Sequence, residues 1–291
     1  TTTEVKIKNM PIRGKIQIVK KSADYNDITK DKKGALLEDA VFEVFDSKNV
    51  VVDRITTDSR GVATSKELPI DVYGIREITA PKHYILDDKV FYAEIKVHGD
   101  LVKFEVLNDS EELGVDVQKY GNYEAMPGDM IRYDFEKISN TSTVPLDDFY
   151  WRDILPTNAV RLNKIVTGTW SEHLTYEVLY KTNRRGWETL EDGLSSENSH
   201  TLDCSRSALR LRGGEYITEF KFEFGTVQAG FKQEDAPYIL CSVNGNLPNE
   251  YRFTNKTDVG GNREDEFICA KDAWVTIIYA KPRGKLPQTG W

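Results

Sequence analysis

The stretch Gly14-Lys15-Ile16-Gln17-Ile18-Val19-Lys20 alternates between apolar and polar side chains. Successive side chains of a β-strand point to opposite faces, so this pattern predicts a half-buried strand with Ile16, Ile18 and Lys20 on one face. Lys21 follows one residue later and should therefore point to the other face. The strand register thus distinguishes two neighbouring lysines.

Similar short runs follow this first strand and are separated by turn signals. Alternation recurs at residues 40–45, 91–97 and 101–106, and Asp58-Ser59-Arg60-Gly61 predicts a turn whose glycine takes a positive φ. We expect the runs at 91–97 and 101–106 to pair as a hairpin across His98-Gly99-Asp100. Because no stretch here has a convincing helical pattern, the region is predicted to form a small β-sandwich.

The composition limits the class of protein. A length of 291 residues suggests about two domains, and 30% charged with 39% hydrophobic residues is typical of a globular chain. The net charge of −8 argues against a nucleic-acid partner. An acidic chain rich in Tyr, Thr and Val is typical of an all-β surface protein.

The residues that often carry catalysis or bind metals are scattered. Cys204, Cys241 and Cys269 lack a CxxC spacing and a neighbouring histidine cluster, so we expect no metal site and no cofactor. One disulfide with a free thiol and three buried free thiols both remain open. The four histidines have no serine or cysteine nucleophile motif near them, so a turnover enzyme is not expected.

Three motifs in the first region fall in the order found in one known family. The opening strand Gly14–Lys20, the segment Tyr73-Gly74-Ile75-Arg76-Glu77-Ile78-Thr79-Ala80-Pro81-Lys82-His83-Tyr84 and the closing run Phe104–Asp109 resemble the Cna-B (SpaA-like) domains of Gram-positive pilins. The middle segment is similar to the family's E-box, Y-x-L-x-E-x-x-A-P-x-G-Y, except that His83 stands where the family has glycine. The resemblance implies an intramolecular isopeptide bond between Lys20 and Asn108, with Glu77 as the catalytic acid.

The chemistry of such a bond requires burial. An apolar environment disfavours charge, so it lowers the pKa of a lysine and raises that of a glutamic acid. A neutral Lys20 amine could then attack Cγ of Asn108, while a protonated Glu77 would stabilise the oxyanion and pass a proton to the departing ammonia. The register rival is Lys21, on the opposite face.

A second series of strand patterns begins after Glu111-Glu112-Leu113-Gly114. Its motifs resemble the DUF11-type immunoglobulin-like repeats of bacterial surface proteins, and run in this order: Val115–Lys119, Pro127–Phe135, Asn140-Thr141, Leu146–Pro156 and Tyr251–Asn255, the last expected to be a strand ending at its asparagine. Further strands are predicted at 174–180, 216–224 and 274–279. The region is longer than a typical repeat, and the excess lies around Lys181–Leu211, with a hairpin tip at Asn183-Arg184-Arg185-Gly186-Trp187.

A second isopeptide bond is plausible in this region by the same logic. It would join Lys119 to Asn255. Asp153 is the first choice for the acid, and Glu219 is its rival. An unlinked sandwich remains the alternative to the bond.

The last residues resemble a sorting signal. Leu286-Pro287-Gln288-Thr289-Gly290 is similar to the LPxTG signal of Gram-positive surface proteins, which a sortase cleaves between the threonine and the glycine. Pro287 biases Leu286 towards an extended conformation that suits an enzyme groove, and Gly290 leaves the Thr289 carbonyl open to a nucleophile. We expect the full protein to continue before Thr1 and beyond Trp291.

Together these resemblances imply an all-β chain of two tandem sandwiches: a Cna-B domain at 1–113, an immunoglobulin-like domain at 114–282 and a sorting-signal tail at 283–291. The implied role is a structural, extracellular, wall-anchored pilin subunit or adhesin stalk, whose partners are a sortase and either peptidoglycan or another pilin subunit. A basal or minor subunit is favoured over a backbone subunit because no convincing pilin-motif lysine is found. The alternative is a binding module whose second domain recognises host matrix or glycan.

Overall fold

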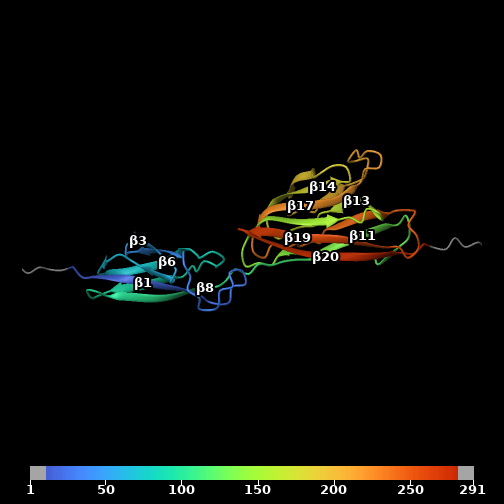
Figure 1. Ribbon diagram of the computed structural model, residues 1–291. Helices are drawn as coiled ribbons and strands as arrows, with labels where there is room; N and C mark the ends of the chain where they lie inside the picture. The colour runs from blue at the N-terminus through green and yellow to red at the C-terminus, as the bar shows by residue number, and fades with distance from the viewer. Residues whose placement is uncertain (1–10, 281–291) are drawn as a thin grey trace, which may run out of the picture. The chain divides into compact units, whose positions relative to one another are not determined.

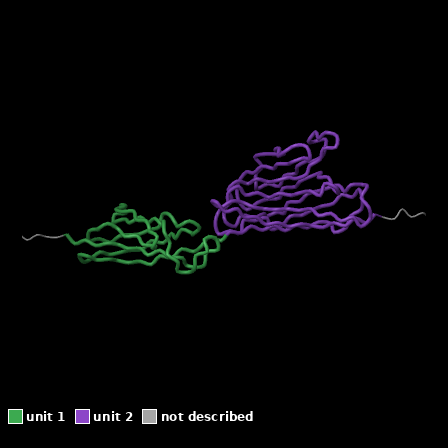
Figure 2. The backbone as a smooth tube through the Cα atoms, in the orientation of Figure 1, with its two compact units in different colours: residues 1–112 green, residues 113–291 purple. Residues whose placement is uncertain are grey.

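The computed structural model describes residues 11–280, and all the regular structure in them is β (Figure 1). The prediction of an all-β fold is therefore confirmed. Within these residues no helix has the length and apolar content needed to cross a membrane. The chain divides into two compact units at 1–112 and 113–291, one residue before the division expected from the sequence (Figure 2).

The first unit is a sandwich of two four-stranded sheets. One sheet has the order β4-β1-β5, with β8 on the other edge of β1, and the second has the order β3-β2-β6-β7. The strands are β1 (Arg13–Ser22), β2 (Val41–Phe45), β3 (Val51–Thr56), β4 (Val62–Thr64), β5 (Leu68–Pro69), β6 (Asp71–Thr79), β7 (Val90–Ile95) and β8 (Leu101–Asn108).

The alternation of the first strand determines which of its side chains enter the core. Ile16 and Ile18 are fully buried and belong to a cluster that also contains Phe42 and Ile75 from the facing sheet. Burying a side chain of this size contributes about 1.5–3 kcal/mol. The same face of β1 carries Lys20 into the interior at 0% exposure. The pattern that builds the core thus also buries a lysine.

The turn before β4 confirms the expected glycine conformation. Gly61 has a φ of 65°, and its carbonyl oxygen accepts the backbone N–H of Lys20 at 2.7 Å. A Cβ atom at position 61 would lie 2.7 Å from the Lys20 carbonyl oxygen. Glycine is therefore needed both for the backbone conformation and for the close approach to β1.

The expected hairpin between residues 91–97 and 101–106 is wrong. β7 pairs with β6, whereas β8 crosses to the other sheet and pairs in parallel with β1. The connecting turn explains the crossing: the Asp100 carboxylate accepts the N–H groups of Lys96 and Val97, and its carbonyl accepts the N–H of Lys15 at 2.7 Å. The turn is thereby fixed to the start of β1 instead of closing a ladder between β7 and β8.

The second unit is a larger sandwich of a seven-stranded and a five-stranded sheet. Their orders are β10-β20-β19-β12-β17-β14-β15 and β16-β13-β18-β11-β9. The strands are β9 (Val115–Gly121), β10 (Glu124–Ala125), β11 (Met130–Asn140), β12 (Leu146–Ile154), β13 (Val160–Val166), β14 (Thr175–Thr182), β15 (Glu188–Ser195), β16 (Thr201–Asp203), β17 (Ile217–Val227), β18 (Tyr238–Val243), β19 (Arg252–Arg263) and β20 (Glu266–Ile278).

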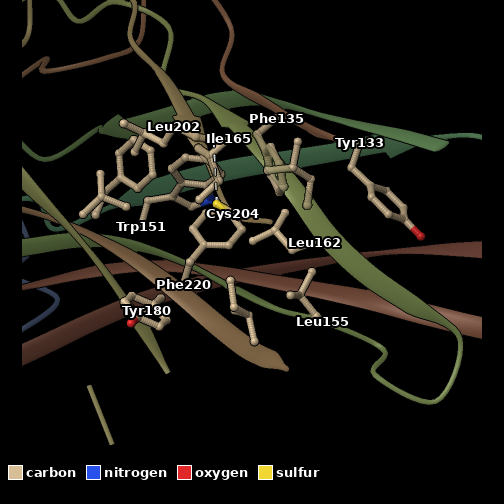
Figure 3. Close-up of a cluster of buried hydrophobic side chains, with 14 of the residues drawn as sticks. Tyr133, Phe135, Trp151, Leu155, Leu162, Ile165, Tyr180, Leu202, Cys204 and Phe220 are labelled. Atoms are coloured by element: carbon tan, nitrogen blue, oxygen red, sulfur yellow. Dashed lines mark hydrogen bonds between the residues drawn. The ribbon is translucent and has the colours of Figure 1, made fainter. Parts of the chain in front are cut away.

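Aromatic side chains fill the core of this unit. Trp151 is fully buried and lies beside Phe135 and Phe220 in the core (Figure 3). The centroid of its ring lies 4.5 Å from that of Phe135, 5.4 Å from that of Phe220 and 4.6 Å from that of Phe222. Its indole N–H donates to the Thr257 hydroxyl at 2.9 Å, so the polar atom of the ring is satisfied. Tilted and edge-to-face aromatic contacts of this kind add to the stabilisation from burial. The core thus holds β12 firmly in place.

Two strand predictions in the second unit have different outcomes. β14 and β15 pair in antiparallel across residues 183–187, which confirms the predicted hairpin tip. The late strand does not end at Asn255, because β19 continues to Arg263 and pairs along its whole length with β20. Asn255 therefore lies inside a central strand and not at the end of one.

Candidate functional site

Three strands bring Lys20, Glu77 and Asn108 together in the first unit. β1 and β8 are parallel neighbours in which Lys20 is opposite Val106 and Ser22 is opposite Asn108. Lys20 and Asn108 are therefore diagonal neighbours on the inner face of one sheet. Glu77 comes from β6 of the facing sheet. All three residues are buried, with exposures of 0%, 5% and 2% respectively.

The side chains of these residues make a closed set of contacts. The Lys20 Nζ donates to Oδ1 of Asn108 and lies 3.1 Å from Oε1 of Glu77. The same Glu77 oxygen accepts the Asn108 Nδ2 at 3.1 Å, and Oε2 accepts the backbone N–H of Asp87 at 3.0 Å. The amine is thus held against the amide of Asn108, and one carboxyl group contacts both reacting side chains.

The electrostatic environment favours an uncharged amine. Burial lowers the pKa of Lys20 below its ordinary value, and the nearby Glu77 opposes this shift. The amine also lies 5.5 Å from the centre of the Phe42 ring, on the apolar side of the cluster. A neutral amine has the free lone pair that nucleophilic attack requires. The contact of Phe42 with the Lys20 amine was not predicted from the sequence.

The neighbouring lysine is placed differently. Lys21 lies on the outer face of β1, where its Nζ is 2.5 Å from Oε2 of Glu105. The two side chains are 29% and 57% exposed, so this is a solvent-screened surface pair. Of the two adjacent lysines, only Lys20 reaches Asn108 and Glu77.

The position of His83 shows how the first unit accommodates its departure from the E-box. His83 has a φ of 65°, in the left-handed region that favours glycine. Its carbonyl accepts the Asn26 side-chain N–H at 2.8 Å, and its ring Nδ1 lies 3.5 Å from Oε2 of Glu111. The backbone therefore keeps the glycine-like turn, and the imidazole is buried beside a carboxylate.

A second cluster lies between the sheets of the second unit. Lys119 comes from β9 in the five-stranded sheet, whereas Asp153 on β12 and Asn255 on β19 come from neighbouring strands of the seven-stranded sheet. Asp153 is opposite Thr257, so Asn255 is its diagonal neighbour on the inner face. All three side chains lie in the interior, at 2%, 0% and 0% exposure.

Lys119 and Asp153 form a fully buried pair. The Lys119 Nζ contacts Oδ2 of Asp153, and both side chains have no exposed surface. The amine also lies 3.9 Å from the centre of the Phe135 ring and 4.9 Å from that of Tyr133. Burial lowers the pKa of Lys119 and raises that of Asp153, while each partner opposes the shift of the other. Both shifts favour the neutral forms, an amine beside a carboxylic acid.

The amide of Asn255 is unusual within this cluster. Neither its Nδ2 nor its Oδ1 makes a hydrogen bond, although both atoms are buried, and Oδ1 of Asp153 also has no partner. The amide is nonetheless close enough to Asp153 to help lower the pKa of that carboxyl group against the effect of burial. Buried amides without partners are rare and costly, so a specific chemical reason for this one is expected.

The rival acid lies elsewhere. Glu219 on β17 is 3.2 Å from Nζ of Lys181 and 3.6 Å from Nη1 of Arg152, in a partly exposed ionic network. Those two cations occupy its carboxylate, and Asp153 is the acid in contact with Lys119. The structure thus brings Lys119 together with Asp153, the first choice from the sequence.

The two clusters differ in how they span the sandwich. In the first unit the lysine and the asparagine are on neighbouring strands of one sheet, and the acid faces them. In the second the acid and the asparagine share a sheet, and the lysine faces them. A bond at Lys20 would join two strands side by side, whereas a bond at Lys119 would join the two sheets.

The residues of the predicted sorting signal, Leu286, Pro287, Thr289 and Gly290, lie outside the described residues.

Comparison with known proteins assigns a family to part of the chain. Residues 25–110 match the model of the SpaA prealbumin-like fold domain. The first unit therefore contains a SpaA-type domain, and the match includes Glu77 and Asn108 but begins after β1. No curated protein matches the chain.

Several solved structures are similar to the chain at low identity. The major pilin subunit BcpA of Bacillus cereus is 16% identical, with a TM-score of 0.29, covering 91% of this chain and 69% of that one. The major pilin SpaD of Corynebacterium diphtheriae is 14% identical, with a TM-score of 0.28, covering 91% and 67%. The Bacillus anthracis TIE protein is 14% identical, with a TM-score of 0.30, covering 93% and 34%.

Proposed function

We propose that the chain is a structural segment of a sortase-anchored pilin subunit or adhesin stalk, in which each sandwich is closed by an intramolecular Lys–Asn isopeptide bond. The observation that carries the proposal is the buried contact of the Lys20 amine with the Asn108 amide, beside a carboxyl group that touches both. An unlinked domain has no need to place an amine, an amide and an acid in its core, since burying such groups costs free energy.

The reaction at the first site can be written atom by atom. The neutral Nζ of Lys20 attacks Cγ of Asn108, and a new C–N bond forms. Glu77 stabilises the developing oxyanion and transfers a proton to Nδ2, which leaves as ammonia when its bond to Cγ breaks. Nζ gives up one proton as the new amide forms, and this proton returns to Glu77 in place of the one that left with the ammonia, so the acid is restored. The reaction happens once per molecule, so we do not propose a turnover enzyme.

The second site supports the same reaction with aspartic acid in place of glutamic acid. Burial lowers the pKa of Lys119 and raises that of Asp153, which favours a neutral nucleophile beside a protonated acid. The unpartnered amide of Asn255 is the third component, since a covalent bond from Nζ of Lys119 would give this group the partner that it lacks. The proposed acid is Asp153, because Glu219 is held in a different ionic network.

The position of the first bond suits a protein under tension. Force on the first unit would enter at the start of β1 and leave after β8. These two strands are parallel neighbours, and the proposed link lies near the C-terminal end of both. With Lys20 joined to Asn108, a covalent path bypasses the chain between two residues that are 88 positions apart in the sequence. The hydrogen-bonded ladder then no longer carries the load alone.

The mass of the intact protein tests both links. We expect the folded chain to be lighter than its sequence by two molecules of ammonia, one for each isopeptide bond. Tryptic peptides that join the segments around Lys20 and Asn108, and those around Lys119 and Asn255, should be found by mass spectrometry. A mass equal to that of the sequence would overturn the proposal for both units.

The proposed anchoring rests on the C-terminal pentapeptide. We propose that a sortase joins the Thr289 carbonyl to peptidoglycan or to another pilin subunit at the surface of a Gram-positive cell, and that the subunit is basal or minor. A Thr289→Ala variant of the full-length protein should fold normally and fail to become covalently attached to the wall, as judged by its release during cell fractionation. Unchanged wall attachment would contradict the anchor.

A further inference from the structure

A pocket of about 410 Å³ lies in the second unit, away from the Lys119 cluster. Its walls come from the start of β13, the loop after β16 and the start of β17, and its lining includes Arg161, Arg206, Tyr216, Leu211 and Ile217. Leu162 and Cys204, which also line it, belong to the core shown in Figure 3, so the floor of the pocket is anchored to the core. This volume is at the small end of the range for ligand sites and suits a compact ligand such as one sugar ring.

Two guanidinium groups give the pocket a positive charge. Arg161 donates from Nη1 to the carbonyl of Val160 at 2.8 Å and to that of Thr157, and it packs on the Tyr216 ring at 4.2 Å. Arg206 donates from Nε to the Leu211 carbonyl at 3.2 Å. Within residues 11–280 neither arginine forms an ion pair. Because a guanidinium has five N–H donors, each group keeps donors that remain available to a ligand.

The only acidic side chain in the lining of this pocket, Glu215, has its negative charge balanced by Arg185, which lies outside the lining. The Glu215 carboxylate accepts the backbone N–H of Arg212 at 3.0 Å, the Nε of Arg185 at 2.6 Å and the Thr182 hydroxyl at 2.9 Å. These hydrogen bonds lower its pKa to about 2, so it stays ionised and bound to Arg185. Glu215 therefore leaves the charges of Arg161 and Arg206 uncompensated.

The surrounding sequence limits the kind of anion that fits. The segment 204–214 contains three arginines and no acidic residue, in a chain whose net charge is −8. A long polyanion would meet repulsion from the rest of this acidic surface. A ligand with a single carboxylate on a small body would be attracted by the pocket without that penalty.

We propose that this pocket binds the carboxylate-bearing terminal sugar of a glycan, a uronic acid or a sialic acid. The planar guanidinium groups match the geometry of a carboxylate. Leu211 and Ile217 are buried in the floor of the pocket, and the half-buried Tyr216 ring in its lining offers apolar surface for the sugar ring. The Ser205 hydroxyl and the Asn163 Nδ2 can bind sugar hydroxyls, since Asn163 uses its Oδ1 to accept from Ser242 at 3.1 Å. The binding role does not depend on either isopeptide bond.

Titration calorimetry on the whole chain tests the ligand class. The probes are a glucuronate-terminated and a sialic-acid-terminated oligosaccharide, each paired with a neutral counterpart that lacks the carboxylate. We expect one of the acidic probes to bind at least about tenfold more tightly than its counterpart, because a charge-assisted hydrogen bond is worth more than a neutral one. Binding of neither acidic probe, equal binding of acid and neutral forms, or preference for a carboxylate-terminated peptide overturns the proposal.

Matched variants locate the binding to the pocket. Arg206→Gln removes an exposed guanidinium of the lining and should weaken acidic-sugar binding at least about tenfold, as should Arg161→Gln. Arg210→Gln is the control, because Arg210 is an exposed arginine of the same loop that does not line the pocket. Equal weakening by Arg210→Gln, or unchanged binding in Arg206→Gln, overturns the assignment. The ammonia loss should be unchanged in all three, which separates this test from that of the isopeptide bonds.

Discussion

Glu77→Ala is expected to leave the first unit folded but unlinked, with one ammonia retained in the intact mass. The substitution removes the group that contacts both Nζ of Lys20 and Nδ2 of Asn108, so the amine and the amide lose their proton shuttle. Loss of the cross-link should destabilise the unit by about 4–5 kcal/mol, by analogy with a disulfide closing a loop of similar length. For a domain of this size that corresponds to roughly 20 °C in melting temperature.

Two further variants separate the missing bond from the missing charge. Glu77→Ala also leaves Lys20 buried without its acid, which adds a cost of its own. Asn108→Ala removes the electrophile and keeps the Lys20–Glu77 pair, so the variant should show no ammonia loss from the first unit, with a smaller loss of stability than Glu77→Ala. Comparing the melting temperatures of the two variants gives the contribution of the pair.

The adjacent lysine supplies the matched control. Lys21→Ala removes only a surface ion pair with Glu105, which is worth about 0–1 kcal/mol, and it should release ammonia as the unchanged protein does. If Lys21→Ala blocked the release and Lys20→Ala permitted it, the assigned reacting lysine would be wrong. If Glu77→Ala released ammonia at the normal rate, Glu77 would not be the acid.

The sequence predicts local features of the fold well because they depend on side-chain periodicity. Alternation along Gly14–Lys20 is enough to place Lys20 on the buried face and Lys21 on the outer one. The positive φ of Gly61 and the hairpin tip at 183–187 follow from turn chemistry in the same way. Each of these features is determined by residues close to one another in the chain.

Features that depend on distant pairing could not be predicted in this way. Period-two alternation does not specify a partner, so residues 101–106 gave no sign that their strand would pair with β1 instead of β7. The extension of β19 to Arg263 depends on its pairing with β20. The pocket is assembled from Arg161, Arg206 and Tyr216, which lie far apart in the sequence and carry no shared motif.

The site residues show the same division. Motif resemblance was sufficient to name Lys119, Asp153 and Asn255, but alternation could not decide between Asp153 and Glu219. That choice depends on which face of its strand each acid occupies relative to a lysine in the opposite sheet. The structure places Asp153 on the inner face of β12 against Lys119, and Glu219 beside Lys181.

Asn255→Ala is expected to abolish the second ammonia loss while leaving the Lys119–Asp153 pair in place. The proposed link closes a longer loop than the one in the first unit, so its loss should cost about 5 kcal/mol. For a unit of this size the melting temperature should fall by roughly 10–20 °C. The measurements are the intact mass and the calorimetric transition of the second unit.

Asp153→Ala should have a larger effect than Asn255→Ala. It also prevents the bond, because the remaining carboxylate candidate, Glu219, is bound to Lys181 and Arg152. In addition it leaves the fully buried Lys119 without its partner, which costs about 3–5 kcal/mol when the amine is charged. The matched control is Glu219→Ala. The second unit of this variant should still release its ammonia, because the substitution disturbs only the partly exposed ionic network with Lys181 and Arg152. Loss of the second ammonia in Asp153→Ala, or its retention in Glu219→Ala, would show that the reaction uses a different acid from the one in contact with Lys119.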